Sequence, residues 1–338
     1  MFQLDKKTLD LIKKTCKGKK HIKLTVGFII DGEIVIKVFN EDGETDSEGY
    51  TYEIGSITKT FTASLLSKYV FENKMQLNDS IQKYIAELDG NQYYPSLRRI
   101  ATHTAGYPER YPLNQWEFIN LFKDMIIGGN IQRVNPLDMD FNKMLALIQK
   151  SILKDMDYKW KYSNFGMALL GYAIGTVTGK GYWDAMNDFL VNELGLRHTY
   201  LGTSGNDLSG FSTKNEHCGN WNWDKINLIS PAGAISSTAE DMLTYAKLNM
   251  YEEKPYLSLC HQKHTKGAKK YDMGLAWWLR EENNNIMSHG GGTGCFSSFL
   301  AMDKQKKVAS VILANYRLGI NSDEKIGFSI LEGLQKDK

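Results

Sequence analysis

The sequence predicts an α+β protein whose antiparallel sheet is formed from both chain ends, is flanked by helices and carries an all-helical insertion. Strand-like segments occur near the two termini, whereas the middle of the chain shows helical spacing without a convincing strand. Each end alone has too few strands for a stable sheet, so we expect the two ends to pair. Residues 1–76 and 228–338 then form one discontinuous domain and residues 77–227 a second, with the active site in the cleft between them.

Composition excludes several classes of protein. At 338 residues the chain is long enough for about two domains. Its 42% hydrophobic and 24% charged residues lie in the globular range, which excludes disordered and fibrous proteins. The 41 basic and 39 acidic residues leave a net charge of +2, which is too small to favour nucleic acid as a partner. The oligomeric state stays open.

The sequence also bears on the compartment. Charged residues begin at Asp5, where a signal peptide needs its apolar stretch, and no apolar run approaches the ~18 residues that cross a bilayer. The four cysteines, Cys16, Cys218, Cys260 and Cys295, lack the spacing of a disulfide scaffold or a zinc site. We therefore expect a cytoplasmic protein with free thiols, no membrane span and no cofactor or metal, although a chain trimmed of its leader would look the same.

The first part of the chain alternates between helix and strand patterns. Up to residue 76, the predicted elements are a surface helix over 4–15, a hairpin of strands over 22–30 and 33–39, a short strand over 50–54 and a helix over 57–71. The hairpin turn is Asp31-Gly32, a dipeptide that readily adopts the positive backbone angles of a tight turn. The helix over 57–71 is apolar nearly all round, so it is expected to be buried.

Later segments follow the same rules. Beyond residue 77, the predicted elements are helices over 142–153, 166–177, 182–193 and 238–249, a hairpin of strands over 295–302 and 307–314, and a final amphipathic helix after Asn321. Ser237 and Glu240 have the spacing of a capping box, which predicts that the helix over 238–249 begins there.

Ser56 and Lys59 form an SxxK pair at the start of the buried helix, where a spacing of three places both side chains on one face. A serine hydroxyl is a poor nucleophile until a base takes its proton, and a partly desolvated lysine is such a base. SxxK occurs at three other places, so only the context, a strand and a glycine followed by a very apolar helix, separates this copy. The alternative is a serine cap followed by a lysine that reaches solvent.

Two further motifs carry polar groups suited to the same chemistry. Tyr162 and Asn164 belong to the chain's only YxN triplet, where a phenol can relay a proton and an amide can hold a carbonyl; alternatively, Asn164 simply caps the following helix. His289 begins the run His-Gly-Gly-Gly before a predicted strand, and Gly291 and Gly292 allow a substrate to lie against the backbone. An amide near Gly292 can then face an oxyanion, unless the run is only a glycine-rich loop with a solvated histidine.

SxxK after a strand, YSN about a hundred residues later and HGG before a C-terminal strand, in that order, resemble the class C β-lactamase and D-alanyl-D-alanine carboxypeptidase group of penicillin-recognising serine hydrolases. The resemblance extends from about residue 25 to 316. Flanking stretches similar to this family's signature segments are 52–63, 100–108, 162–179 and 231–242. The fold implied is the same β-lactamase/transpeptidase-like architecture that the strand and helix patterns predict.

The resemblance implies a role for each motif. Ser56 is acylated, Lys59 and Tyr162 share the proton transfers, and Asn164 contacts the substrate. The amides of Ser56 and Gly292 form the oxyanion hole. True class C β-lactamases carry lysine where this sequence has His289, a substitution seen in related peptidases and esterases. Histidine is only partly charged near neutral pH, which disfavours efficient β-lactam hydrolysis.

The remaining candidates have simpler interpretations. His103 is expected to be a structural hydrogen-bonding residue rather than a catalytic one. Cys260 and its neighbouring histidines lack a fourth ligand for zinc. The tryptophan pairs at 221 and 223 and at 277 and 278 either line the cleft or, more commonly for such pairs, pack in the core.

The sequence therefore predicts a serine hydrolase that acts through an acyl-enzyme on Ser56. Its expected substrate is a small molecule: a β-lactam, an ester, or an amide or D-peptide as in a D-Ala-D-Ala carboxypeptidase or D-aminopeptidase. The alternative is a non-hydrolytic penicillin-binding, sensor or scaffold protein with the same fold. No residue selects among these substrates.

Overall fold

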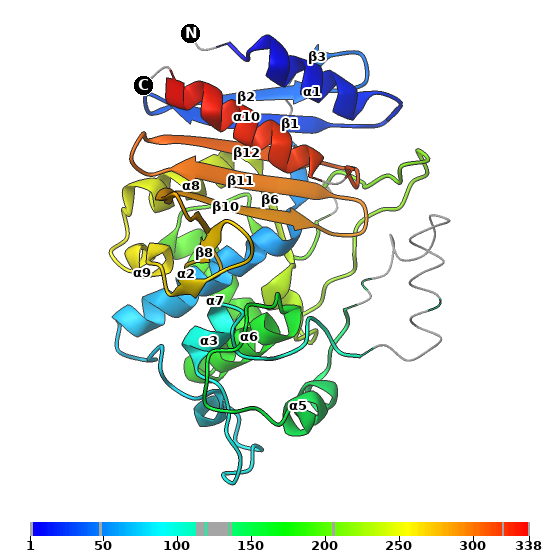
Figure 1. Cartoon of the computed structure of the whole chain (residues 1–338). Helices are drawn as coiled ribbons and strands as arrows, with labels where there is room; N and C mark the ends of the chain where they lie inside the picture. The colour runs from blue at the N-terminus through cyan, green and yellow to red at the C-terminus, as the bar shows by residue number, and fades with distance from the viewer. Residues whose placement is uncertain are drawn as a thin grey trace.

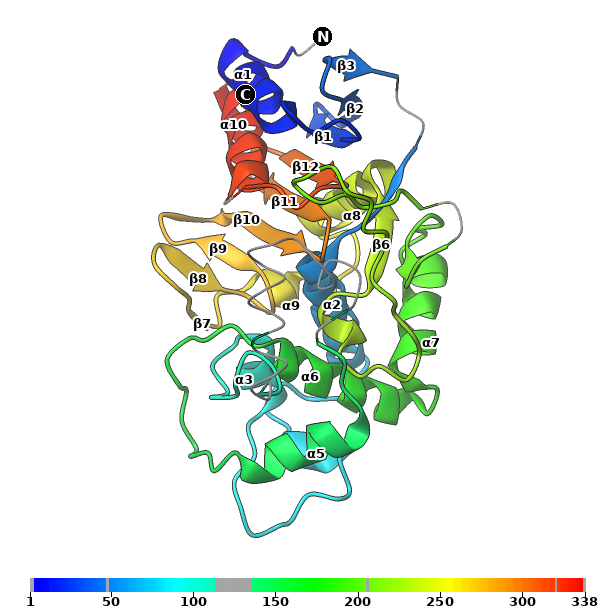
Figure 2. The same ribbon diagram turned by 90° about the vertical axis from the view of Figure 1, so that its right-hand side faces the viewer.

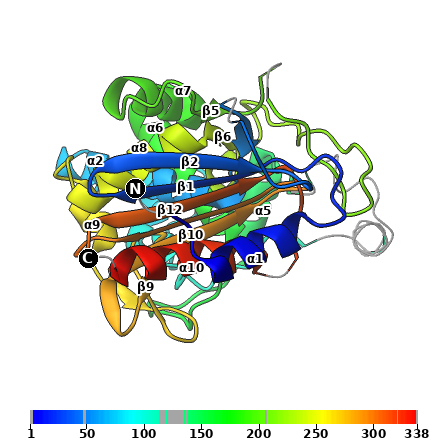
Figure 3. The same cartoon turned by 90° about the horizontal axis from the view of Figure 1, so that it is seen from above.

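The chain folds into a central sheet with helices on both faces (Figure 1). The computed structural model describes residues 3–46, 49–112, 119, 135, 137–204, 207–319 and 321–336. α1 (Lys6–Cys16) and α10 (Ser322–Lys336), from opposite chain ends, pack together on one face of the sheet, as Figure 3 shows from above. α8 (Ala239–Tyr251) and α2 (Thr58–Phe71) lie on the other face (Figure 2).

Nine strands in the described part of the chain form the large sheet, and every neighbouring pair is antiparallel. In order across the sheet they are β3 (Glu44–Thr45), β2 (Glu33–Phe39), β1 (Leu24–Ile30), β12 (Val308–Ala314), β11 (Ser297–Asp303), β10 (Asn283–Gly292), β9 (Trp278–Arg280), β8 (Tyr271–Met273) and β7 (Thr265–Lys266). β1 pairs with β12, so the prediction that the two chain ends share one sheet is confirmed.

A smaller sheet lies beside the large one and contains β4 (Thr51–Glu53), β6 (Ile235–Thr238) and β5 (Tyr200–Leu201). β5 belongs to the segment that the sequence predicts to be all-helical, so that segment is not wholly helical. A two-residue strand is too short to show alternation, and its pairing with β6 depends on residues distant in the chain.

The other helices lie mainly between residues 80 and 260. They are α3 (Leu97–Ala101), α5 (Phe141–Lys150), α6 (Asn164–Thr178), α7 (Gly181–Asp188), α9 (Leu257–His261), the 3-10 helices η1 (Gly55–Ile57), η2 (Ile81–Tyr84) and η5 (Ser230–Ala232), and the π-helix η4 (Phe189–Glu193). α3, α5 and α6 lie below the sheet (Figure 2). No helix in the described ranges combines the length and apolarity that a bilayer crossing requires.

Two apolar cores hold these layers together. One lies between the sheet and the α1–α10 pair and includes Ile12, Phe28 and Ile326. The larger one lies on the opposite face and continues through α2 and α6. α2 is buried along ten consecutive residues from Thr58 to Ser67, as its nearly all-round apolar sequence predicts, so its first turn is held rigidly.

Two helix starts differ from the sequence interpretation. The hydroxyl of Thr238, rather than that of Ser237, caps α8 by accepting from the amide of Asp241 at 3.2 Å. Ser163, rather than Asn164, caps α6 by accepting from the amide of Gly166 at 2.8 Å. In each case the cap lies one residue away from the expected position, a shift within the usual uncertainty of helix boundaries.

The expectation of four free thiols is wrong for two cysteines. Cys218 and Cys295 form a disulfide across a sequence separation of 77, with their Cα atoms 6.6 Å apart. The loop around Gly210 packs closely on Cys295, since a Cβ on Gly210 would lie 2.6 Å from the Cβ of Cys295. This loop contact, which no sequence spacing reveals, brings the two sulfurs together. Cys16 and Cys260 are free and buried, as expected.

Candidate active site

Ser56 lies in η1, at the junction between β4 and the buried helix α2. Gly55 before it adopts φ +50°, a backbone angle that favours glycine, and turns the chain sharply from strand to helix. The half-buried Ser56 lines a cleft of about 800 Å³ together with Tyr162 and His289. A serine on such a turn presents its hydroxyl to the cleft rather than to the core.

Lys59 lies one turn further along and is fully buried. Its Nζ is 2.9 Å from Ser56 Oγ and donates to the carbonyl oxygen of Ala232 at 2.6 Å. Burial disfavours the ammonium, so the pKa of Lys59 falls well below its usual value, although the charge of Glu109 opposes this shift. A neutral amine can accept the proton of Ser56, whereas an ammonium cannot.

The phenol of Tyr162 completes a cluster of three polar groups. Its hydroxyl donates to Ser56 Oγ at 2.7 Å, and the Lys59 Nζ lies 4.8 Å from its ring centroid. Burial raises the pKa of Tyr162 above its usual value, so the phenol keeps its proton at neutral pH. The structure thus brings together the three residues from two motifs 106 positions apart.

His103 holds the segment that carries Tyr162. Its Nδ1 accepts from the amide of Ser163 at 3.2 Å, and its carbonyl oxygen accepts from Lys161 at 2.9 Å. The imidazole centroid also lies 4.9 Å from that of Tyr162. Burial lowers the pKa of His103 to about 3, so it is neutral and acts in this structure as a packing and hydrogen-bonding residue.

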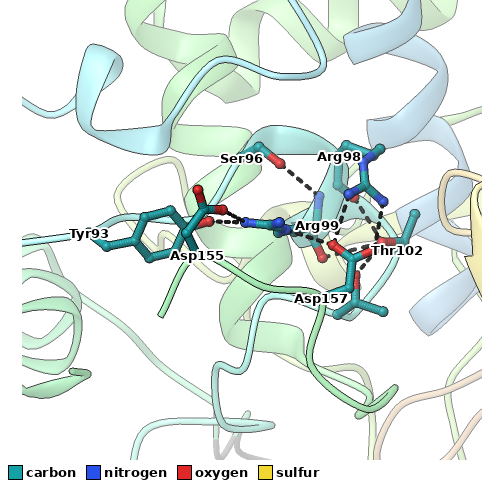
Figure 4. Close-up of polar contacts among 8 residues, drawn as sticks. Tyr93, Ser96, Arg98, Arg99, Thr102, Asp155 and Asp157 are labelled. Carbon is teal, nitrogen blue, oxygen red and sulfur yellow. Dashed lines mark hydrogen bonds and ion pairs between the residues drawn. The ribbon is translucent and has the colours of Figure 1, made fainter. Parts of the chain in front are cut away.

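Ion pairs fix the loop that leads to Tyr162, at Asp155 and Asp157, to α3 (Figure 4). Asp157 accepts from Arg98 Nη2 at 2.8 Å and from Arg99 Nε at 2.6 Å, and Asp155 accepts from Arg99 Nη1 at 2.5 Å. Since these carboxylates precede Tyr162 by only a few residues, the ion pairs restrict where the phenol segment lies.

Asn164 is the first residue of α6, and 8% of its surface is exposed. The backbone N–H groups of Asn164 and Phe165 both donate to the carbonyl oxygen of Glu109. Because Ser163 supplies the helix cap, the side chain of Asn164 is not needed for that purpose.

The glycine run lies directly on the backbone that leads to Ser56. A Cβ on Gly291 would lie 2.0 Å from the carbonyl oxygen of Ile54, and a Cβ on Gly55 would lie 2.5 Å from the amide nitrogen of Gly292. Only glycine permits this approach, which places the amides of Ser56 and Gly292 at adjoining positions of the cleft. Two such amides are what an oxyanion hole requires.

His289 lines the cleft but is 2% exposed. Its Nδ1 lies 2.7 Å from the carbonyl oxygen of Gly290, a contact that assigns the ring proton to Nδ1. Burial, with the nearby Lys59 charge, lowers the pKa of His289 to about 3. The side chain is therefore neutral at physiological pH and supplies no permanent charge to a substrate carboxylate.

Several cleft residues were not predicted. Arg317 extends over the glycine run, where a Cβ on Gly292 would meet its Nη1, and its charge acts on Asp323, which lines the same cleft. Tyr271 also lines the cleft. Neither residue belongs to a motif; Arg317 closely follows the predicted strand over 307–314, and Tyr271 has no sequence signal. They reach the site because β8 and the segment after β12 border it.

Of the four paired tryptophans, one lines the cleft and the other three are buried. Trp278 lines the cleft, whereas Trp277 is fully buried and Trp221 and Trp223 are each 8% exposed. The sequence could not separate them, since either face of a short strand accepts an indole.

Glu53, two residues before the Gly55 turn, is a buried carboxyl that the sequence did not single out. Its Oε1 accepts from the amide of Trp221 at 2.7 Å, and burial raises its pKa to about 7. Elsewhere, His261 contacts Glu252 and Asn249, and within the described ranges no three His, Cys, Asp or Glu side chains cluster as metal ligands.

Known structures share this fold. A class C beta-lactamase superposes with a TM-score of 0.77 over 97% of this chain and 95% of its own, at 23% identity. A beta-lactamase/D-alanine carboxypeptidase from Pseudomonas syringae gives 0.78 over 97% and 98%, at 19% identity. An octameric penicillin-binding protein homologue from Pyrococcus abyssi gives 0.76 over 98% and 77%, also at 19% identity. The fold class predicted from the sequence is thus confirmed.

Sequence comparison defines the family. A beta-lactamase of Providencia stuartii is 26% identical over 71% of this chain, and protein flp of Staphylococcus aureus (strain MW2) is 23% identical over 78%. The matches cover 59% and 52% of those proteins, so the chain spans little more than half of their length. The family model described as Beta-lactamase matches residues 17–335. The chain therefore belongs to the beta-lactamase family, whose members are serine hydrolases.

Proposed function

We propose that this protein hydrolyses a small amide, D-peptide or ester through an acyl-enzyme on Ser56. The observation that carries the proposal is the cluster of Ser56, Lys59 and Tyr162, in which Oγ lies 2.9 Å from the amine and 2.7 Å from the phenol. A serine that only capped the helix would not need a fully buried lysine at this distance, because burying an amine carries a large desolvation cost.

In the first step, Ser56 Oγ attacks the carbonyl carbon and its proton passes to the neutral amine of Lys59. The carbonyl electrons move to oxygen, and the amides of Ser56 and Gly292 stabilise the oxyanion. When the electrons return, the bond to the leaving group breaks. Tyr162 gives its proton to the leaving amine or alkoxide and is reprotonated by the Lys59 ammonium.

In the second step, water attacks the acyl group. The same base system takes a proton from water, and Ser56 Oγ leaves as the hydroxyl, releasing a carboxylic acid. The neutral state of His289 supports peptide, amide or ester substrates over β-lactams, because the position that carries lysine in class C β-lactamases here supplies no charge.

The test is intact-mass measurement with a fluorophosphonate and with benzylpenicillin, followed by hydrolysis assays on p-nitrophenyl esters and D-alanyl peptides. We expect stoichiometric phosphonylation and ester or peptide turnover in the native protein, and neither in S56A. S151A is the matched control, since Ser151 belongs to another SxxK copy and only donates to Leu147 within α5. Turnover that survives in S56A would reject the proposal, and a persistent acyl adduct without product would favour the non-hydrolytic alternative.

A further inference from the structure

We propose that the cleft wall formed by Trp278 and Tyr271 is a subsite for a flat apolar leaving group. The inference rests on the proposed function, because a leaving group exists only if Ser56 is acylated. Both rings are half-buried and line the same cleft as Ser56 and Tyr162. We refer to Trp278 and Tyr271 as the aromatic wall.

Strand register places the aromatic wall next to the catalytic cluster. β9 pairs with β10 so that Trp278 lies opposite Ser288, the residue before His289. Directly paired residues of antiparallel strands share one face of the sheet, and Ser288 also lines the cleft. Trp277, the residue before β9, is instead fully buried and stacks on Tyr245 of α8.

The indole of Trp278 is held from two sides. Its centroid lies 4.8 Å from that of Trp160 and 5.4 Å from that of Tyr271, which meets it edge-on at 70°. Rings packed in this way lose little further freedom when a ligand binds, so the apolar surface is already in place. An indole on a flexible loop would lose conformational entropy on binding, which would weaken the affinity.

The position of Tyr162 decides which part of the substrate meets this wall. Tyr162 protonates the leaving group, which must therefore depart on its side of the scissile carbonyl. The rings continue from Tyr162 to Trp160, 6.5 Å between centroids, and from Trp160 to Trp278. Gly292 of the oxyanion hole instead lies against Arg317. The leaving group thus lies between the phenol and the aromatic wall.

Contact with an aromatic face favours a flat ring over a puckered one of equal carbon count. Aromatic pairs gain free energy beyond the area that they bury, which corresponds to a preference of about two- to tenfold. The chemical class expected at the subsite is an aryl or arylmethyl group attached to the departing oxygen or nitrogen.

The experiment compares kcat/KM for benzyl acetate and cyclohexylmethyl acetate, whose acyl groups and carbon counts are the same and whose rings are one methylene from the reacting oxygen. The native protein should prefer the benzyl ester by about two- to tenfold. W278L keeps an apolar side chain but removes the ring, and it should reduce the ratio to about one while Ser56 still reacts with the fluorophosphonate. Y251L is the control, since Tyr251 is an exposed aromatic at the end of α8, away from the cleft lining.

The outcomes separate the two proposals. Equal kcat/KM for the two esters in the native protein, or an unchanged ratio in W278L, would overturn the subsite while the hydrolase proposal stands. If W278L no longer reacts with the fluorophosphonate, W278F is measured in its place. W278F keeps an aromatic ring and should retain the benzyl preference. Loss of that preference in W278F that still reacts with the fluorophosphonate would also count against the subsite. If the native protein neither reacts with the fluorophosphonate nor hydrolyses esters, the proposed function fails and the subsite with it.

Discussion

The Nζ of Lys59 donates to the carbonyl oxygen of Ala232 across 2.6 Å, although 173 residues separate the two. The same Nζ also donates to Ser56 Oγ at 2.9 Å, so it is held between Ala232 and Ser56. The contact between α2 and η5 thus fixes the position of the Lys59 amine beside Ser56, as well as joining two segments of the fold.

Replacing Lys59 by methionine should abolish most of the reactivity of Ser56. General-base catalysis typically contributes about 10²- to 10⁴-fold, so the rate of acylation by a p-nitrophenyl ester should fall by that factor. Stopped-flow measurement of the p-nitrophenol burst gives this rate. K83M, from another SxxK copy whose lysine pairs with Asp79, should react at the native rate. A K59M burst rate within threefold of native would exclude Lys59 as the base.

Replacing His289 by lysine should shift the acidic limb of the plot of acylation rate against pH to lower pH. Activity requires neutral Lys59, so it rises with pH through the lowered pKa of that amine. A cation at position 289 disfavours a second positive charge nearby and lowers the pKa of Lys59 further. Acylation rates between pH 5 and 9 measure the shift. H289N, which adds no charge, is the control, and identical limbs for H289K and H289N would contradict the prediction.

Alanine at Gly291 should damage the oxyanion hole, whereas alanine at Gly290 should be tolerated. A Cβ on Gly291 would lie 2.0 Å from the Ile54 carbonyl oxygen, but the nearest atom to a Cβ on Gly290 is 3.8 Å away. Loss of one oxyanion donor costs about 10²- to 10³-fold in kcat, and G291A should lose at least that much. Steady-state kinetics on one ester compares the variants. Equal activity of G291A and G290A would refute the close-contact argument.

The Cys218–Cys295 disulfide should stabilise the folded protein. A cross-link of this kind typically contributes about 2–4 kcal/mol to the free energy of unfolding by restricting the unfolded chain. Urea denaturation with and without dithiothreitol should show that loss in the native protein. The C218S/C295S double variant should have the lower stability in both conditions, and a native protein indifferent to reductant would show that the cross-link contributes nothing.

Arg317 should favour substrates that carry a carboxylate. Its exposed guanidinium lies over Gly292, whereas His289 is neutral. For an exposed charge the gain is modest, so R317A should raise KM for benzyl hydrogen succinate, whose carboxylate lies on the acyl part, about two- to fivefold. The same variant should leave KM for benzyl acetate unchanged. Equal effects on both substrates would indicate a general packing defect instead.

Local patterns in the sequence predicted β1, β2, β4, β11, β12 and the longer helices, but not the strands β7 to β10 or the short strands β3, β5 and β6. The Asp31-Gly32 turn, the branched strands at both ends and the apolar helix after Ser56 each follow from spacing and residue type within a short window. The spacing of Ser56 and Lys59 also implies their proximity, because one helical turn brings them to one face. Helix caps at Ser163 and Thr238 lay one residue from their predicted positions, since in each case two adjacent residues have side chains that can cap a helix.

What the sequence by itself determined, then, is the fold class, the order of the motifs and the nearness of Ser56 to Lys59. The first two depend on the order of segments along the chain, and the third depends on helical spacing. Only the tertiary structure decided the contact of Tyr162 with Ser56, the anchoring of Lys59 by Ala232, the disulfide at Cys218 and the aromatic wall. These depend on how segments distant in the chain pack against one another, and burial, which makes His289 neutral, arises only from that packing.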